Sequence, residues 1–175
     1  ANGARLPYDL LALTTGAEPR RLPAAVGGDL AGVFTMRDLA DADALAAAIR
    51  PGTRALIVGG GYIGLEAAAV LSQVGLATLL VEQAPRILAR VAAPATADYF
   101  RDLHRRHGVE IREEVGLVRL IGGPAVTGAE LTDGARVATD LVLVGIGVAP
   151  RDQLAAAAGI ATRDGVLVDA AGRAS

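Results

Sequence analysis

The feature that most constrains this chain is a strand, a glycine-rich turn, a helix and a second strand in direct succession. The apolar run 55–58 is followed by GGGYIG, then by an Ala- and Leu-rich run over 65–75, and then by a second apolar run over 77–82. Short apolar runs are typical of buried strands, whereas the longer run predicts a helix that ends at Gly75. These segments predict a βαβ unit of about thirty residues, and therefore a parallel sheet.

The sequence around this unit extends the same alternation. Helices are expected over 39–50 and 95–107, and strands over 109–112 and 140–144. Asp38 is a candidate cap for the first of these helices. Turn signals divide 115–139 into short alternating runs, which favour antiparallel strands. We therefore predict an α/β fold with a Rossmann-like, doubly wound parallel sheet and a small antiparallel β-meander insertion.

The segments near the two ends carry weaker patterns. The run 8–13 is expected to be a buried strand that enters a turn at 14–16, and the Pro- and Gly-rich segment 17–33 a connection. A short helix is expected over 151–158 and a hairpin over 161–168. The chain begins without Met and stops after an apolar run, so we expect it to be a piece of a longer protein.

Composition excludes several classes of function. A net charge of −2 and an aromatic content of 3% argue against a nucleic-acid-binding protein. The chain has no Cys, and every basic residue is Arg, so thiolate, Fe–S and Schiff-base lysine chemistry are excluded within it. No apolar run approaches the ~18 residues of a membrane span.

The hexapeptide GGGYIG fits the spacing G-x-G-x-x-G with Gly59, Gly61 and Gly64. In such a motif the first glycine makes the turn, the second lets a pyrophosphate approach the backbone, and the third lets the helix pack on the strand. The helix start offers unpaired N–H groups to phosphates. A structural turn is the alternative reading, but Glu82 follows eighteen residues after Gly64, where an acid binds the adenine ribose. The pattern therefore favours dinucleotide binding.

Glu82 also bears on which dinucleotide is bound. A carboxylate accepts hydrogen bonds from ribose hydroxyls and repels the 2′-phosphate of NADP. Arg86 and Arg90 lie close downstream, and either could neutralise that phosphate. The sequence favours NAD(H), with NADP(H) as the open alternative.

Several longer stretches together carry a family resemblance. They are LALTTGAEPR, MRDLADADAL, VGGGYIGLEAAAVLSQVG, VEQAPRILAR, VAAPATADYFRDLHRRHGVEI and VGIGVAP. The chain resembles the FAD- and NAD-dependent flavoprotein reductases of the pyridine nucleotide-disulfide oxidoreductase-like superfamily. Within them it is most similar to the ferredoxin reductase components of aromatic-ring dioxygenases, close to the biphenyl type, with rubredoxin and putidaredoxin reductases as near neighbours.

The resemblance implies a domain organisation. Residues 23–147 are then the NAD-binding domain, and residues 1–22 and 148–175 are flanking segments that resemble parts of an FAD domain. The family's N-terminal FAD glycine motif, its Gly-Asp motif and its C-terminal domain have no counterpart in these 175 residues. We therefore expect FAD to be a cofactor of the complete protein, and the fragment alone to be inactive.

The implied function is electron transfer in the cytoplasm. The complete protein would pass electrons from NADH through FAD to an Fe–S ferredoxin, or a rubredoxin, that serves an oxygenase. No acid–base residue is needed for hydride transfer, so no catalytic residue is assigned. The alternatives are an NADH oxidase or nitrite reductase-type flavoprotein, and an isolated NAD-binding module without catalysis.

The resemblance also suggests site residues. Tyr62 would lie over the flavin, Glu66 and Gly147 near the nicotinamide, Arg37 at the FAD phosphates, and Thr15 and Gly16 in a turn that closes over the flavin. The remaining cofactor-binding candidates are Ile63 within the motif and Gln83 and Arg90 after Glu82. For Tyr62 and Glu66 the alternatives are helix packing and a partly exposed helix acid.

Two polar clusters carry weaker readings. His104 and His107 are three residues apart, but no Cys or acid pair completes a metal site, so no metal is predicted. The basic residues Arg101, Arg105, Arg106 and Arg112 could face an acidic ferredoxin. Such a run is more often a solvated helix face.

Overall fold

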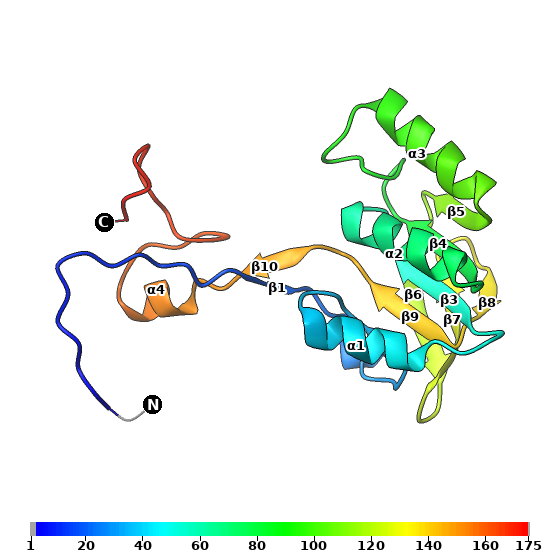
Figure 1. The fold of residues 1–175 in the computed structure, drawn as a ribbon, viewed down its shortest axis with the longest axis horizontal. Helices are drawn as coiled ribbons and strands as arrows, with labels where there is room; N and C mark the ends of the chain where they lie inside the picture. Colours follow the sequence, from blue (N-terminus) through cyan, green and yellow to red (C-terminus); the bar gives the residue numbers. More distant parts are fainter. Residues whose placement is uncertain (1–2, 175) are drawn as a thin grey trace. The chain divides into compact units, whose positions relative to one another are not determined.

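A five-stranded parallel sheet forms the centre of the larger of two units in this computed structural model, which describes residues 3–174 (Figure 1). The sheet unit is Pro19–Gly147. The terminal unit combines the described residues up to Glu18 with those from Val148 onward.

All neighbouring strands of the sheet run parallel. The strands are β2 (Val33–Phe34), β3 (Arg54–Val58), β4 (Ala77–Glu82), β5 (Val109–Glu113) and β9 (Leu141–Val144). Their order across the sheet is β2-β9-β3-β4-β5. In the central strand, Ile57 lies opposite Leu80 on one side and Leu143 on the other.

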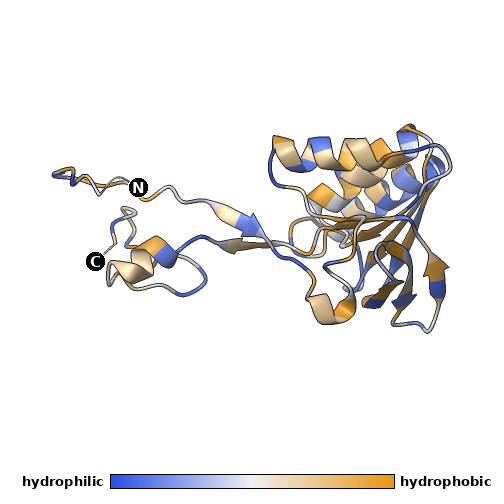
Figure 2. Cartoon of the chain, turned by 90° about the horizontal axis from the view of Figure 1, so that it is seen from below, coloured by the Kyte–Doolittle hydropathy of each residue, from blue (hydrophilic) through white to orange (hydrophobic). Residues whose placement is uncertain are grey.

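Different layers cover the two faces of the sheet (Figure 2). One face packs against α1 (Leu39–Ala48), α2 (Tyr62–Gln73) and α3 (Pro94–Arg106). The other packs against an antiparallel sheet of β6 (Leu117–Gly122), β7 (Val126–Leu131) and β8 (Arg136–Ala138). Side chains of a strand alternate between faces, so Ile57 joins the core under the helices and Leu56 the core under the antiparallel strands. Strands buried on both faces explain the continuous apolar runs in the sequence.

The predicted α/β fold, with its parallel sheet and antiparallel meander, is confirmed. Asp38 caps α1 as expected, because its carboxylate accepts a hydrogen bond of 3.1 Å from the N–H of Asp41. The start of α2 differs from the prediction, because the helix begins at Tyr62 inside the glycine motif rather than after it. Gly61 is the capping residue, in an extended conformation.

The predicted buried strand over 8–13 is wrong. These residues form no strand, and the side chain of Leu10 is 94% exposed. An apolar run becomes a buried strand only where neighbouring strands and a covering layer accept it, and the described residues provide neither there. The short helix expected after 150 is α4 (Gln153–Ala157), and an antiparallel bridge between Thr162 and Val166 closes the expected hairpin.

The segment 17–33 is more than the connection that was expected. It contains β1 (Ala17–Pro19), which pairs with β10 (Val148–Pro150), a 3₁₀ helix η1 (Ala24–Val26) and the start of β2. Elements of two or three residues are too short to leave a periodic pattern. Within the described range, no helix has both the length and the apolar character that crossing a bilayer requires.

Candidate nucleotide-binding site

The glycine motif lies at the carboxyl end of the central strand β3, where the strand order of the sheet switches from one side of β3 to the other. From β3 the chain passes through α2 to β4 on one side, while β9 pairs with β3 on the other. In open α/β sheets, ligands bind outside the carboxyl ends of the strands at such a switch point. The segments that meet there are 59–64, 82–92 and 145–147.

Two glycines of the motif are required by close approach of backbone atoms. A methyl group on Gly64 would lie 2.0 Å from the carbonyl oxygen of Gly59, so the packing of α2 on β3 admits no side chain there. Gly59 has a φ of +110°, and a methyl group on it would lie 2.4 Å from the carbonyl oxygen of Gly145. These contacts match the turn and packing roles expected for the two residues.

Gly61 is different, because nothing lies within 4 Å of the position that its side chain would take. It caps α2, whose first intrahelical hydrogen bond runs from the N–H of Leu65 to the carbonyl oxygen of Gly61. The N–H groups of Tyr62, Ile63 and Gly64 therefore have no partner within the helix. An open helix start of this kind fits a pyrophosphate group, which accepts hydrogen bonds and is stabilised by the helix dipole.

Glu82 ends β4 with its carboxylate turned toward the glycine motif. Its Oε2 accepts a hydrogen bond of 2.7 Å from the N–H of Gly60, and its Oε1 accepts one of 2.7 Å from the N–H of Ala84. A carboxylate has about four acceptor positions, so each oxygen keeps capacity for a ribose hydroxyl. The two backbone donors fix the orientation of the group.

The two arginines that the sequence left as alternatives, Arg86 and Arg90, have different surroundings in the loop 83–92. Arg86 donates hydrogen bonds to the carbonyl oxygens of Ala92, at 2.9 Å, and Ala89, at 3.3 Å. Its guanidinium therefore stabilises the loop itself. Arg90 is exposed, with Nη2 3.7 Å from the side-chain position of Gly147. Gln83 is also exposed, at the beginning of the loop.

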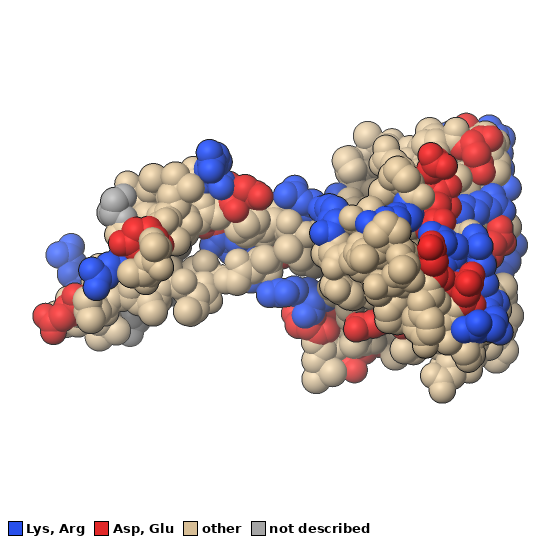
Figure 3. Space-filling view, turned by 90° about the horizontal axis from the view of Figure 1, so that it is seen from above, with Lys and Arg blue, Asp and Glu red and all other residues tan. Residues whose placement is uncertain are grey.

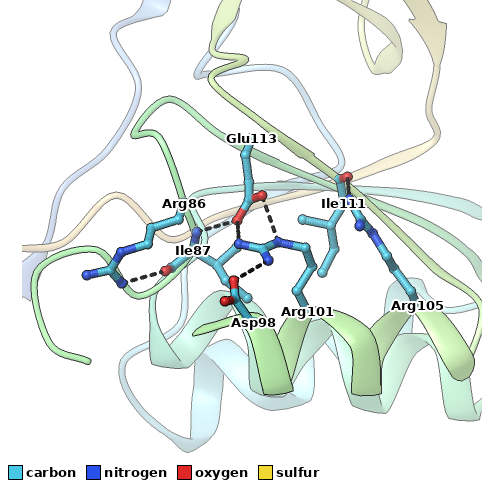
Figure 4. Close-up of polar contacts among 7 residues, drawn as sticks. All are labelled: Arg86, Ile87, Asp98, Arg101, Arg105, Ile111 and Glu113. Carbon is cyan, nitrogen blue, oxygen red and sulfur yellow. Dashed lines mark hydrogen bonds and ion pairs between the residues drawn. The ribbon is translucent and has the colours of Figure 1, made fainter. Parts of the chain in front are cut away.

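The sequence analysis did not identify the residues of β5 and α3 that hold this loop in place. Glu113, at the end of β5, accepts a 2.8 Å hydrogen bond from the N–H of Ile87 and pairs with Arg101 of α3 (Figure 4). Hydrogen bonds to Glu113 and Asp98 raise the pKa of Arg101 above its ordinary value. Within the loop, the side chains of Ile87 and Leu88 are buried.

The structure brings several predicted residues to this edge of the sheet. The side chains of Tyr62 and Ile63, in the first turn of α2, are 59% and 40% exposed. Gly147 lies just beyond β9, with a φ of +102°. Glu66, one turn into α2, is exposed and makes no hydrogen bond or ion pair with the described residues. Exposure of Glu66 agrees with the alternative of a helix acid open to solvent, and its contact with the nicotinamide stays a prediction.

The residues suggested for the flavin are divided between the two units. In the sheet unit, Arg37 is exposed, and its backbone N–H donates to Asp41 at 2.7 Å. In the terminal unit, Thr15 donates its hydroxyl to the carbonyl oxygen of Arg151, and Gly16 accepts a 2.9 Å hydrogen bond from the N–H of Arg151. The roles of these three residues beside the flavin stay predictions.

Two of the four arginines in the basic cluster of α3 and β5 form ion pairs with neighbouring acids. Arg101 pairs with Glu113 and Asp98, and Arg112 pairs with Glu110 and Asp133. On the face shown in Figure 3, acidic and basic side chains of this unit are interspersed. This arrangement favours a solvated surface over a basic docking patch.

His104, one of the two histidines considered for a metal, lies between α3 and α2. The ring nitrogens of His104 lie 2.8 Å from the carbonyl oxygen of Phe100 and 3.0 Å from that of Leu65, so this histidine links α3 to α2. Over residues 3–174, no group of three or more His, Cys, Asp or Glu residues is arranged to hold a metal ion.

Comparison with known proteins decides the family. The model of the family described as "Pyridine nucleotide-disulphide oxidoreductase" matches residues 1–175. The chain belongs to this family. Its Rossmann-like unit, glycine motif and acidic residue at the end of β4 agree with that membership.

Two curated relatives are similar to this chain along nearly its whole length. The biphenyl dioxygenase system ferredoxin–NAD(+) reductase component of Paraburkholderia xenovorans is 45% identical over 174 residues, covering 99% of this chain and 42% of the relative. The 5,5′-dehydrodivanillate O-demethylase ferredoxin reductase subunit of Sphingobium is 44% identical, covering 97% of this chain and 41% of the relative. The sequence-based resemblance is thus confirmed.

Solved structures agree with this relationship. A covalent putidaredoxin reductase–putidaredoxin complex matches with a TM-score of 0.90 and 35% identity, covering 99% of this chain and 43% of that chain. A ferredoxin reductase from Rhodopseudomonas palustris matches with a TM-score of 0.89 and 38% identity, covering 96% of this chain and 42% of that chain. The chain therefore spans less than half the length of the relatives that it matches.

Proposed function

We propose that this chain is the NAD(H)-binding part of a flavoprotein oxidoreductase that passes electrons from NADH through FAD to a ferredoxin serving an oxygenase. The observation that carries the proposal is the open start of α2 at Gly61, with Glu82 turned toward the same loop. The names of the 45% and 44% identical relatives, both ferredoxin reductase components, support the choice of acceptor.

Each part of the nucleotide has a candidate partner at this edge of the sheet. The pyrophosphate would accept hydrogen bonds from the free N–H groups of the first turn of α2. The adenine ribose hydroxyls would donate to Glu82, whose charge disfavours the 2′-phosphate of NADPH. The nicotinamide would lie beside Tyr62, Glu66 and Gly147. Gln83 and Arg90 would be further contacts of the nucleotide. No residue of the chain is required to move a proton during hydride transfer.

The complete protein would provide the rest of the electron path. FAD, when bound, accepts two electrons as a hydride and releases them one at a time. We propose residues 23–147 as the NAD-binding domain and 1–22 and 148–175 as parts of the FAD domain, with Arg37, Thr15 and Gly16 on the flavin side. We also place the complete protein in the cytoplasm, with a ferredoxin or rubredoxin as its acceptor.

The alternative enzymes are less well supported. A water-forming NADH oxidase from Lactobacillus brevis shares the fold at 23% identity, and that likeness concerns the fold alone. The relatives that are 37–45% identical include ferredoxin and putidaredoxin reductases. A binding module without catalysis is distinguished by activity: the complete natural protein should reduce a [2Fe–2S] ferredoxin at the expense of NADH.

The nucleotide assignment is tested by calorimetric titration of the complete natural protein with NADH and then NADPH. We expect NADH to bind more tightly, and Glu82→Ala to weaken its binding by about tenfold or more, because charged hydrogen bonds are lost. Equal or tighter binding of NADPH would contradict the role of Glu82 and transfer it to Arg90. Absence of binding by either nucleotide would overturn the proposed function.

A further inference from the structure

The loop 83–92 packs directly on the glycine motif. The N–H of Leu88 donates a hydrogen bond of 2.9 Å to the carbonyl oxygen of Gly60. The side chain of Ile87 is fully buried, and a methyl group on Gly60 would lie 2.7 Å from its Cγ2. Any displacement of Ile87 and Leu88 would therefore move the loop relative to the residues that are proposed to bind the pyrophosphate.

The conformation of this contact is not one that the loop would adopt by itself. Leu88 has a φ of +54°, in the left-handed region that is unfavourable for residues other than glycine. Such a residue persists only where surrounding contacts enforce its conformation. Burial of Leu88 and its bond to Gly60 supply two of these contacts.

Glu113 supplies the third contact, from the neighbouring strand. Its Oε1 accepts hydrogen bonds from the N–H of Ile87 and from Nη2 of Arg101, both at 2.8 Å (Figure 4). Its Oε2 accepts a further hydrogen bond of 2.8 Å from Nε of Arg101. Both side chains are 16% exposed, so the two-pronged pair is largely shielded from water.

The loop held in this way bears two of the candidate nucleotide contacts. Gln83 and Arg90 are both exposed on it, and Arg90 lies near Gly147 at the end of β9. Arg86 closes the loop on itself through the carbonyl oxygens of Ala89 and Ala92. The loop is therefore internally braced, and Glu113 fixes its middle, at Ile87, to the end of β5.

We propose that Glu113, oriented by Arg101, is a positioning residue for the nucleotide: through the N–H of Ile87 it holds the loop 83–92 against the glycine motif, and so sets the affinity for NADH. This inference rests on the proposed function. Neither Glu113 nor Arg101 needs to touch the nucleotide. The competing explanation is that the pair only fastens α3 to β5.

Arg105 offers a matched control for that explanation. Its Nη2 donates a 3.1 Å hydrogen bond to the carbonyl oxygen of Ile111, so it also joins α3 to β5, but no hydrogen bond links it to the loop (Figure 4). Arg105→Leu should therefore loosen the same helix without disturbing the loop.

The experiment measures KM and kcat for NADH, and the NADH Kd, in the complete natural protein. For Glu113→Ala we expect KM and Kd to rise about tenfold, as for loss of a charge-assisted hydrogen bond to a buried N–H, with kcat at saturation unchanged. For Arg105→Leu we expect both to stay within about twofold of the wild type. Glu113→Gln, which keeps an acceptor oxygen for Ile87, should recover part of the lost affinity.

Two results would overturn the inference. One is a folded Glu113→Ala protein with unchanged KM and Kd, and the other is an equal loss of affinity in Arg105→Leu. If Glu113→Ala does not fold, Arg101→Lys keeps the charge without the two-pronged geometry: a raised KM then supports the inference, and an unchanged KM contradicts it. Failure of the wild type to bind NADH would contradict the proposed function instead, so the two failures are distinguishable.

Discussion

Glu82 and Gly60 are joined by a hydrogen bond of 2.7 Å between a carboxylate oxygen and a backbone N–H, which ties the end of β4 to the glycine motif at the end of β3. The second oxygen of Glu82 is held by the N–H of Ala84. The acid proposed to bind the ribose is therefore oriented before any ligand arrives. Such preorganisation lowers the entropic cost of binding.

This arrangement predicts a change in nucleotide preference for Glu82→Gln. The variant keeps one acceptor oxygen but loses the charge and the second acceptor. We expect NADH affinity to fall by about tenfold, because a charged hydrogen bond is weakened, and NADPH affinity to fall less, because repulsion of the 2′-phosphate is relieved. Calorimetric titration with both nucleotides measures the ratio. Equal losses for the two would argue that Glu82 acts only by supporting Gly60.

Alanine substitutions at two glycines of the motif should affect the stability of the protein differently. Gly64→Ala places a methyl group 2.0 Å from the carbonyl oxygen of Gly59, so we expect a loss of stability of about 3 kcal/mol or more. Gly61→Ala enters open space at a negative φ, so its stability should change by less than about 1 kcal/mol.

Although Gly61→Ala should fold stably, we expect it to bind NADH weakly. The methyl group of Gly61→Ala would occupy the space that a pyrophosphate needs, and NADH affinity should fall although the protein folds. Urea unfolding and NADH titration of both proteins test the pair. A Gly61→Ala protein that binds NADH as tightly as the wild type would place the phosphates elsewhere.

The central βαβ unit was predictable because its signals are local. Buried strands such as β3 need a continuous apolar run, and the turn after it needs glycine at Gly59 for its positive φ. The residues that meet these requirements lie within a few positions of one another in the sequence. The order of the strands across the sheet and the register of Ile57 with Leu80 and Leu143 depend on distant contacts, and appear only in the structure.

The errors share a physical cause. The run 8–13 has the composition of a strand, but composition does not say whether a neighbouring strand is present. Glu113 and Arg101 were missed because their effect on Ile87 crosses from β5 and α3 to a loop, which no local pattern encodes.

The loop predicts different roles for its two arginines. Arg86→Met removes hydrogen bonds to the carbonyl oxygens of Ala89 and Ala92, so stability should fall by about 1 kcal/mol or more. Arg90→Met removes an exposed side chain, and its stability should stay within about 0.5 kcal/mol of the wild type while nucleotide affinity falls. Unfolding curves and NADH titrations test both variants. Unchanged stability in Arg86→Met would mean that its carbonyl contacts do not brace the loop.

The opposite edge of the sheet predicts a pH-dependent contribution to stability. At the amino ends of β3 and β9, Arg54 pairs with Asp140 at 2.7 Å. Hydrogen bonds from the side chain and the backbone N–H of Arg54 lower the pKa of Asp140 from 3.8 to about 2. Ionised Asp140 therefore stabilises the fold fully above its ordinary pKa, and this contribution is lost as the pH falls through about 2.

Asp140→Asn should accordingly lower the free energy of unfolding by a constant amount near neutral pH. The effect should be small, because both side chains are close to half exposed and solvent screens the pair. The difference from the wild type should shrink as the pH drops below about 4 and vanish below about 2. Asp102→Asn is the control, since Asp102 is an exposed acid without a hydrogen bond or ion pair to the described residues. Urea unfolding across this range decides: a difference that persists undiminished at pH 2 would mean that the charge of Asp140 is not its cause.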